Sequence, residues 1–533
     1  AQFREDAGPD VHPPRPDRFQ TINNFYTSTV YNKGGELNRM LFTLLGEEDF
    51  RKASDLYFDR FDGQAVTVED WVQCMADASG RDMTQFMKWY TQAGTPTVKA
   101  DWDYDATTRD FTLKLTQDIP QIADKSDGKP RHMPVCFGLV GPDGKDVVNE
   151  TLELTKVSQT FTFPNVPGGS VPSIFRNFSA PVVLDAPYTD KELLHLMAYD
   201  SDGFNQWEAG NTFMLNNMLE QVDRYEAGQP IIVDPKITDT FRTILQRTDM
   251  DQELKSLALS LPSYSEIALQ RKVVDPQAIS AVREEFLNEI SAKLLQEWRA
   301  VYRDNHQPAA PYDPQDAGRR SLQNMALSFI SRSIPGDLAA KQYHSANNMT
   351  DRYAALNTLL NLNQVVPARD KCLEDFYSRF KNDALVIDKW VRAQAGSDSS
   401  DLLKTVQDLA THECFKNPSP NRMRALYGAF CANPKGFHAE DGSGYKLVAD
   451  FIMDLDSKNP QTATRFIAAF AEYKRYKPAL QSQMKEQLER MASMPKLSPD
   501  LSEKLESYLG KNEFARLRSG ASVAQSHTTP SQP

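Results

Sequence analysis

The chain has 533 residues, of which 40% are hydrophobic and 10% aromatic, a composition that supports ordinary globular cores. At roughly 150 residues per domain, this length predicts three or four domains. The net charge of −12 indicates a solvated surface, and no basic tract favours nucleic acid as a partner. No run of 18 apolar residues occurs, so we expect no membrane span.

The cysteine pattern bears on the redox compartment. The five cysteines are odd in number, scattered, and never in CxxC spacing, which favours reduced thiols and a cytoplasmic location over a disulfide framework. They are Cys74, Cys136, Cys372, Cys414 and Cys431.

Residues 1–95 are predicted to be helical. Apolar residues at helical spacing begin after Gly34 and stop at Gly46, and a second helical pattern ends at the turn Asp62-Gly63. Thr67 and Asp70 have capping-box spacing at the start of a third helix.

A fourth helix is expected from about Met83, ended by Gly94 and Pro96. The apolar faces of these helices lack partners within residues 1–95, which predicts an exposed, aggregation-prone patch for that segment taken alone.

The period changes after this segment. Residues 98–104 and 111–115 alternate between apolar and polar side chains across a turn-rich gap, which predicts a β-hairpin. Further strands are expected at 135–140, 151–154, 159–163 and 181–184. Residues 96–187 are therefore predicted to form a β-sandwich.

Helical periodicity returns from residue 188 to residue 518. Long amphipathic segments such as Pro276–Tyr302 recur with short polar breaks, which favours an α-solenoid-like array. Residues 519–533 are predicted to be a disordered tail. The fold class is thus multidomain α+β: a helical segment, a β-sandwich, and a large α-helical domain.

Local metal and nucleotide motifs are missing from the sequence. It contains no HExxH, GxSxG, Walker loop or GxGxxG, and His412-Glu413 lacks the second histidine of a zinc helix. No two of the eight histidines lie within four residues of each other. The string Asp441–Gly444 is interpreted as a loop, and Cys414 and Cys431 as packed thiols rather than nucleophiles.

Tyr31 follows a polar and aromatic run and precedes the helix that begins at Gly34. A phenol with a reference pKa of about 10 is neutral at pH 7 and can donate a hydrogen bond. Aimed at the oxyanion of a tetrahedral intermediate, such a donor is worth on the order of 10²–10³ in rate. From spacing alone, a packing or capping role is favoured over this catalytic role.

Six ordered segments nevertheless resemble the bacterial branch of the aminopeptidase N family, and the similarity extends from residue 1 to about 510. The Tyr31 segment is the longest and resembles the stretch that follows the third zinc ligand of that family. The segments are Asn23–Leu41, His12–Pro16, Lys88–Val98, Tyr343–Arg352, Asn417–Phe430 and Phe437–Tyr445.

The resemblance implies a zinc exopeptidase whose catalytic domain, of the thermolysin-like type, ends with residues 1–95. In the family, HExxH and a downstream glutamate bind Zn²⁺, and a GxMEN segment binds the amino terminus of a peptide. By the family pattern both precede the first residue here, so Zn²⁺ is expected as a cofactor of the full-length protein with no ligand in this chain. Tyr31 matches the tyrosine that stabilises the tetrahedral intermediate, Tyr26 the wall of the first side-chain pocket, and Asn23 part of the same wall.

Arg424 and Arg465 match arginines that face the enclosed chamber of the family's helical domain. Gln461 lies one helical turn before Arg465, on the same face. Guanidinium groups can hold peptide carbonyls or a terminal carboxylate, so these residues are candidates for substrate binding. The alternative for each arginine is a surface or interdomain salt bridge.

Three functional hypotheses remain open at this point. The first is that the chain is part of a zinc aminopeptidase, a cytoplasmic monomer that acts on peptides, and that residues 1–533 alone are inactive. The second is a helical scaffold that kept the fold and lost the chemistry. The third is an independent peptide-binding module.

Overall fold

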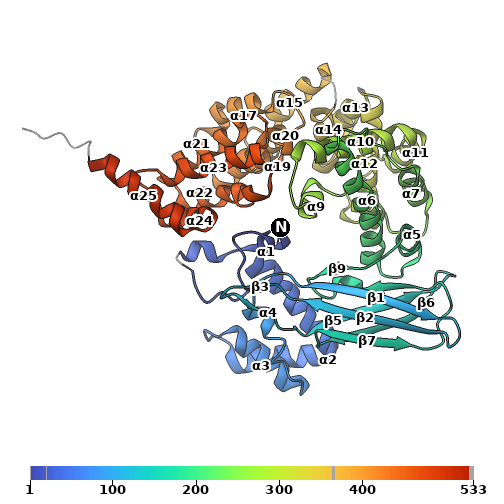
Figure 1. Ribbon diagram of the computed structural model, residues 1–533. Helices are drawn as coiled ribbons and strands as arrows, with labels where there is room; N and C mark the ends of the chain where they lie inside the picture. The colour runs from blue at the N-terminus through green and yellow to red at the C-terminus, as the bar shows by residue number, and fades with distance from the viewer. Residues whose placement is uncertain (1, 20, 336, 363–365, 527–533) are drawn as a thin grey trace, which may run out of the picture. The chain divides into compact units, whose positions relative to one another are not determined.

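The computed structural model describes residues 2–19, 21–335, 337–362 and 366–526. The chain packs as two compact units, Ala1–Phe213 and Met214–Pro533, and the division falls within helix α6 (Gly203–Glu226). Within the described ranges, no helix combines the length and hydropathy that crossing a bilayer requires. The ribbon is shown in Figure 1, and each unit is described by itself.

The first unit opens with short helical pieces followed by a long helix. The backbone of the long helix leaves helical geometry at Gly46 (φ 78°, ψ 169°), so it contains the two helices predicted on either side of that glycine. The pieces are α1 (Gln2–Ala7), the 3₁₀ turn η1 (Ile22–Phe25), the π-helix η2 (Thr29–Lys33), α2 (Gly34–Phe61), α3 (Val68–Ser79) and α4 (Lys88–Thr91).

The capping box predicted for α3 is confirmed. The Thr67 hydroxyl accepts from the Asp70 N–H at 3.3 Å, and the Asp70 carboxylate accepts from the Thr67 N–H at 2.9 Å. These backbone and side-chain hydrogen bonds from Thr67 lower the pKa of Asp70. The fourth predicted helix is shorter than expected, because residues 84–87 form turns and only α4 is α-helical.

Thr67→Ala is expected to weaken α3 by about 1 kcal/mol. The Asp70 N–H loses its acceptor, the Thr67 hydroxyl, and the reciprocal hydrogen bond from the Thr67 N–H to the Asp70 carboxylate loses that support. Hydrogen exchange of the α3 amides measures this local opening. Thr67→Ser keeps the hydroxyl and serves as the control. If serine and alanine accelerate exchange equally, the cap contributes nothing to α3.

The sandwich contains two main sheets. One has the order β7-β2-β1-β9 and the other the order β6-β5-β8, with a small β3-β4 ribbon beside them. The predicted hairpin is confirmed, with Thr97 opposite Asp118 and Asp105 opposite Asp110. The strands are β1 (Thr97–Asp105), β2 (Asp110–Asp118), β3 (Gln121–Ile122), β4 (Ser126–Asp127), β5 (Met133–Val140), β6 (Asp146–Leu154), β7 (Ser158–Phe163), β8 (Val171–Ile174) and β9 (Val183–Asp185).

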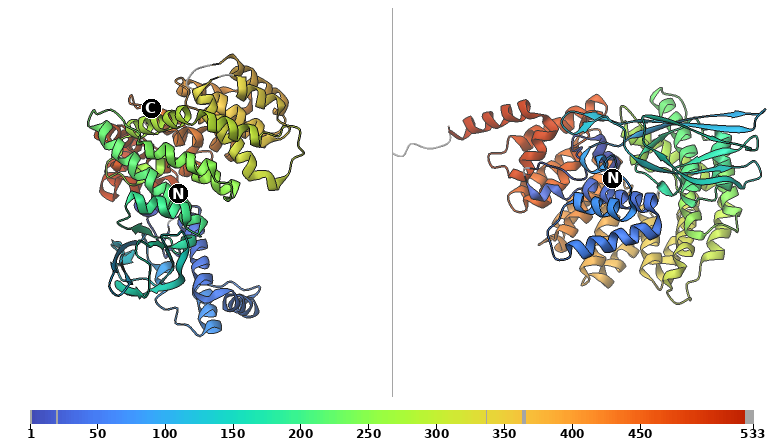
Figure 2. Two further views of the ribbon diagram at one scale, coloured as in Figure 1. Left: turned by 90° about the vertical axis from the view of Figure 1, so that its right-hand side faces the viewer. Right: turned by 90° about the horizontal axis from the view of Figure 1, so that it is seen from below.

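Helix α2 shares its core with the sandwich. Leu37 of α2, Trp89 of α4 and Phe137 of β5 belong to one buried hydrophobic cluster. Figure 2 (left) shows the blue helix beside the strands. The apolar faces that were expected to lack partners within residues 1–95 therefore find them in the sandwich, outside that segment.

The turn η3 (Arg176–Phe178) lies between β8 and β9, helix α5 (Asp190–Tyr199) follows β9, and from α7 onward the chain is helical. Many helices start with a side-chain cap followed by proline, which places the ring where no N–H is needed. The caps with a following proline are Asp234, Asp275, Ser419, Asn433, Asn459 and Ser498.

In the second unit, successive helices pack side by side along a curved array (Figure 1). They are α7 (Pro235–Gln246), α8 (Gln252–Ala258), α9 (Tyr264–Leu269), α10 (Pro276–Lys293), α11 (Leu295–Asn305), α12 (Ala317–Ser333), α13 (Asp337–Ser345), α14 (Met349–Leu360), α15 (Pro367–Phe380), α16 (Ala384–Ala395), α17 (Leu402–Thr411), α18 (Pro420–Met423), α19 (Ala429–Ala432), α20 (Pro434–Phe437), α21 (Ser443–Asp456), α22 (Pro460–Ile467), α23 (Pro478–Ala492), α24 (Pro499–Leu509) and α25 (Lys511–Ser526). Short turns between them are η4 (Pro314–Asp316), η5 (Glu413–Phe415), the π-helix η6 (Arg424–Gly428), η7 (Ala468–Phe470) and η8 (Tyr473–Arg475).

Two expectations for this unit need correction. The segment Pro276–Tyr302 is two helices, because Leu294 (φ −113°, ψ 21°) interrupts it. Residues 519–526, expected to be disordered, continue α25, and residues 527–533 lie outside the described residues.

Candidate functional site

Tyr31 lies at the centre of the π-helix η2, immediately before α2. Its N–H donates to the Thr27 carbonyl at 3.2 Å, and the Gly34 N–H donates to the Thr29 and Tyr31 carbonyls. The side chain is 63% exposed, and its hydroxyl forms no hydrogen bond with the described residues. A neutral phenol in this state is free to donate to a ligand.

Tyr26 is brought next to Tyr31, with ring centroids 6.3 Å apart and an interplanar angle of 34°. The row of rings continues through Phe25 to Phe19, at centroid distances of 5.9 and 5.6 Å. Asn23 lies on η1, just before these rings, and is exposed. The structure thus groups Tyr26 with Tyr31 and adds Phe25 and Phe19, which sequence reasoning missed.

Helix α1 contacts the beginning of the Tyr31 turn. The Glu5 carboxylate accepts from the Thr29 N–H at 2.8 Å, and the Gln2 amide donates to the Thr29 hydroxyl at 3.2 Å. Two charged or polar side chains of one helix therefore hold Thr29, which lies two residues before Tyr31.

The other end of the turn is tied to α1 by a buried ion pair. The Lys33 ammonium donates to the Asp6 carboxylate at 2.7 Å and to the Gly94 carbonyl at 3.0 Å, and both side chains are almost fully buried. Burial lowers the pKa of Lys33 to about 8, while the Asp6 charge raises it and that of Arg131 lowers it. Sequence reasoning missed this pair, because its members are 27 residues apart and follow no motif.

His12, part of the segment that resembles the family, supports the same turn. Its Nδ1 lies 2.6 Å from the Asp10 carbonyl, which can only accept, so Nδ1 carries a proton. Its Nε2 lies 2.7 Å from the Thr27 hydroxyl, which in turn accepts from the Val30 N–H at 3.2 Å. Thr27 is thereby fixed at the point where the Tyr31 N–H is bound.

The predicted arginines lie in the second unit. Arg424 begins the π-helix η6 and donates to the Asn421 side chain, while Arg465 and Gln461 project from α22. All three are exposed, and neither arginine has an ion pair within the described part of the chain. Their elements are neighbours, since the rings of Tyr427 and Phe466 are 6.4 Å apart. Within the described residues the two arginines form no salt bridge, and their role in substrate binding stays a prediction.

No three histidine, cysteine, aspartate or glutamate side chains in the described ranges lie close enough to hold a metal ion. His412 instead accepts from the Cys414 N–H at 3.3 Å and caps η5, and Glu413 accepts from the Tyr377 hydroxyl at 2.5 Å. Burial raises the pKa of Cys431 to about 12 and that of Cys414 above its usual value. These residues do not fit a zinc site, and the thiols do not fit a nucleophile.

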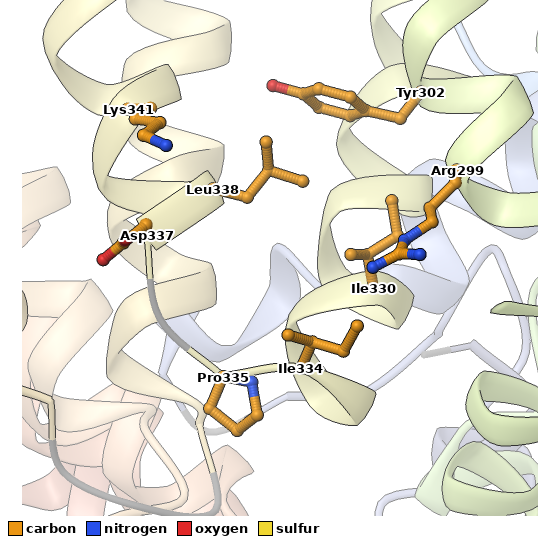
Figure 3. Close-up of a pocket in the computed structure, with 8 residues that line it drawn as sticks. All are labelled: Arg299, Tyr302, Ile330, Ile334, Pro335, Asp337, Leu338 and Lys341. Carbon is orange, nitrogen blue, oxygen red and sulfur yellow. The ribbon is translucent and has the colours of Figure 1, made fainter. Parts of the chain in front are cut away.

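The second unit contains a pocket of about 530 Å³ between α11, α12 and α13. Figure 3 shows Arg299, Tyr302 and Ile330 on one side and Leu338 and Lys341 on the other. The two cations are exposed, and the pocket holds none of the residues singled out from the sequence.

Comparison with protein families assigns all three parts of the chain. Residues 1–90 match the peptidase family M1 domain, residues 94–187 a domain of unknown function, DUF3458, with an Ig-like fold, and residues 190–510 a domain of unknown function, DUF3458_C, of ARM repeats. The chain belongs to the family defined by this ARM-repeat domain. The predicted fold class, a β-sandwich followed by a large solenoid-like helical domain, is confirmed.

Bacterial aminopeptidases are among the relatives. Aminopeptidase N of Escherichia coli is 39% identical over 95% of this chain and 59% of its own length, and that of Haemophilus influenzae is 35% identical with the same coverage. A crystal structure of Legionella pneumophila aminopeptidase A in complex with aspartic acid has a TM-score of 0.84 and 26% identity, covering 96% of this chain and 61% of that one. The resemblance to aminopeptidase N is confirmed, and the chain spans about three fifths of the length of the curated relatives it matches.

Proposed function

We propose that this chain is part of a zinc-dependent aminopeptidase that hydrolyses N-terminal residues from peptides. The homology to aminopeptidase N over 95% of the chain is the observation that carries the proposal. In this proposal the zinc ligands lie in a part of the protein other than these 533 residues, which alone do not turn over peptides. The matched span, 59% of the E. coli relative, supports that division.

Tyr31 is proposed as the residue of this chain that acts in the reaction. Its phenol donates a hydrogen bond to the oxyanion as the substrate carbonyl becomes tetrahedral, where a donor gains most strength. The side chain is exposed, and its hydroxyl forms no hydrogen bond with the described residues, which supports this role. Zinc bound elsewhere in the protein would polarise the carbonyl of the substrate and activate the attacking water.

The remaining site residues are proposed to bind substrate. Tyr26, whose ring lies beside that of Tyr31, lines the pocket for the first side chain together with Asn23. Arg424, Arg465 and Gln461 bind peptide carbonyls or the terminal carboxylate, and the exposure of the three side chains supports this role. We further propose a cytoplasmic monomer without nucleic-acid or membrane partners, and the five free cysteines support the compartment.

The experiment that tests the function compares the full-length protein with residues 1–533 alone on an aminoacyl reporter substrate. The full-length protein is expected to contain zinc and to lose its turnover in chelator, with recovery when zinc is restored. The 533-residue chain is expected to show neither zinc nor turnover. A full-length protein without chelator-sensitive turnover would instead support the non-catalytic scaffold or the peptide-binding module.

A further inference from the structure

The Tyr31 side chain makes few contacts that would hold it in place. It is 63% exposed, its hydroxyl has no hydrogen bond within the described ranges, and its ring neighbour, Tyr26, is itself 56% exposed. The position of the phenol therefore depends on the backbone of η2. A shift of about 1 Å in a catalytic group can cost on the order of 100-fold in rate, so this backbone must be fixed precisely enough for catalysis.

The π-helical geometry of η2 needs outside support. Such turns are rare in proteins; they occur mostly as single turns inside α-helices and are frequent at functional sites. Here both ends of the turn are bound by α1: Glu5 accepts from the Thr29 N–H, and Asp6 accepts from Lys33. Thr29 and Lys33 lie two residues before and two residues after Tyr31.

We propose that α1 is a positioning element for Tyr31, in which Asp6 acts through Lys33 and Glu5 acts through Thr29. The inference rests on the proposed function of Tyr31, since it assigns a task to residues that never touch substrate. It gives the buried ion pair a role in the reaction beyond holding the fold.

The charges around Lys33 explain why Asp6 must be a carboxylate. Asp6 is the anion that faces the ammonium, whereas Arg131 repels it and also donates to the Gly94 carbonyl at 3.1 Å. Without the Asp6 charge, burial and Arg131 would lower the pKa of Lys33 further. A neutral amine bonds more weakly to Asp6 and Gly94, so the end of the turn after Tyr31 would loosen.

The first test measures the turn itself, by hydrogen exchange in the full-length protein. Asp6→Asn is expected to accelerate exchange of the Tyr31 and Gly34 amides by about tenfold or more, with the β5 amides unchanged. Asp17→Asn, which removes an exposed carboxylate bound to Arg15, is the matched control and should change neither. Unchanged exchange at Tyr31, or equal acceleration at β5, would overturn the proposal. If Asp6→Asn fails to fold, Glu5→Gln tests the Thr29 end with the buried pair intact.

The second test is kinetic and uses a double-mutant cycle. Asp6→Asn is expected to lower kcat about 10- to 100-fold with little change in KM. The loss should be largest where Lys33 is already neutral in the variant but still charged in the unmutated protein, and it should shrink above the unmutated pKa of about 8. In a Tyr31→Phe background the same change should cost almost nothing, because there is no phenol left to position. Equal losses in both backgrounds would overturn the proposal. Absence of any chelator-sensitive turnover in the wild-type protein would contradict the proposed function instead, and hydrogen exchange would still decide whether α1 holds the turn.

Discussion

Tyr31→Phe in the full-length protein is expected to lower kcat by on the order of 10²–10³, with zinc content and KM nearly unchanged. The change removes one hydroxyl, which forms no hydrogen bond with the described residues, so stability should not fall. The loss would thus arise from the interaction with the tetrahedral intermediate alone. Steady-state kinetics on an aminoacyl reporter, together with metal analysis, measure both quantities.

Tyr26→Phe is the matched control, because its ring lies 6.3 Å from that of Tyr31 and is similarly exposed. Phenylalanine keeps the ring that would line the first side-chain pocket, so kcat should change only a few-fold. If Tyr31→Phe retains turnover, Tyr31 has a packing role, as its spacing alone indicated. If both variants lose turnover equally, the aromatic pair acts as one binding surface.

Local signals in the sequence predicted much of the fold. The Thr67–Asp70 spacing, the break at Gly46 and the hairpin of β1 and β2 each depend on residues close together in the chain, and the structure confirms them. Strand β8 was missed, because all four of its residues are buried and one is Pro172, so no alternation is visible.

Contacts between distant residues could not be predicted. The apolar face of α2 was expected to lack partners within residues 1–95, but the sequence did not show that Leu37 would share a core with Phe137, 100 positions later in the chain. Likewise Arg475 donates to the carbonyls of Ala268, Leu269 and Arg271, which lie more than 200 residues earlier. Periodicity identifies a face that must be buried but not the element that buries it.

The candidate site shows the same division. Tyr31 and Tyr26 were selected from the sequence through a family resemblance, and the structure places their rings side by side. The π-helix around Tyr31 could not be predicted from the spacing of apolar residues, because its residues also fit the start of an ordinary α-helix. Asp6 and Lys33 were not selected, because a buried ion pair has no sequence motif.

The second large effect is expected at Arg176, which joins two carboxylates inside the sandwich. It lies 2.8 Å from Asp146 and 3.0 Å from Asp200, whose side chain is 0% exposed. Arg176→Met would leave Asp200 buried without its cation, which typically costs about 3–5 kcal/mol. Hydrogen exchange of the β5 amides measures the loss, and Arg51→Met, which breaks an exposed pair with Asp55, is the control and should leave exchange unchanged.

The destabilisation should depend on pH. Burial already raises the pKa of Asp200, and hydrogen bonds from Ser173 and Asp202 and the charge of Arg176 oppose that rise. Removing Arg176 raises this pKa further, so the folded variant takes up a proton at a pH where the unfolded chain has none. The penalty should therefore be smaller near pH 5 than near pH 8. A penalty that is the same at both values would mean that lost packing, rather than the unpaired charge, causes it.

Gly138→Ala offers an independent way to break the same cluster. A Cβ at Gly138 would lie 2.0 Å from the guanidinium carbon of Arg176, so the guanidinium must leave both carboxylates although every charged residue remains. The residues on either side of Arg176 show what the cluster holds. Phe175, Asn177 and Phe178 all have positive φ (58°, 55° and 48°), a conformation that non-glycine residues adopt only under constraint. Arg39 of α2 donates to the carbonyls of Asn177 and Phe178, so this strained turn also binds the helix that follows Tyr31. Gly138→Ala should therefore destabilise β5 like Arg176→Met and also accelerate exchange in the first turns of α2, whereas an effect confined to β5 would show that the turn and α2 are held independently.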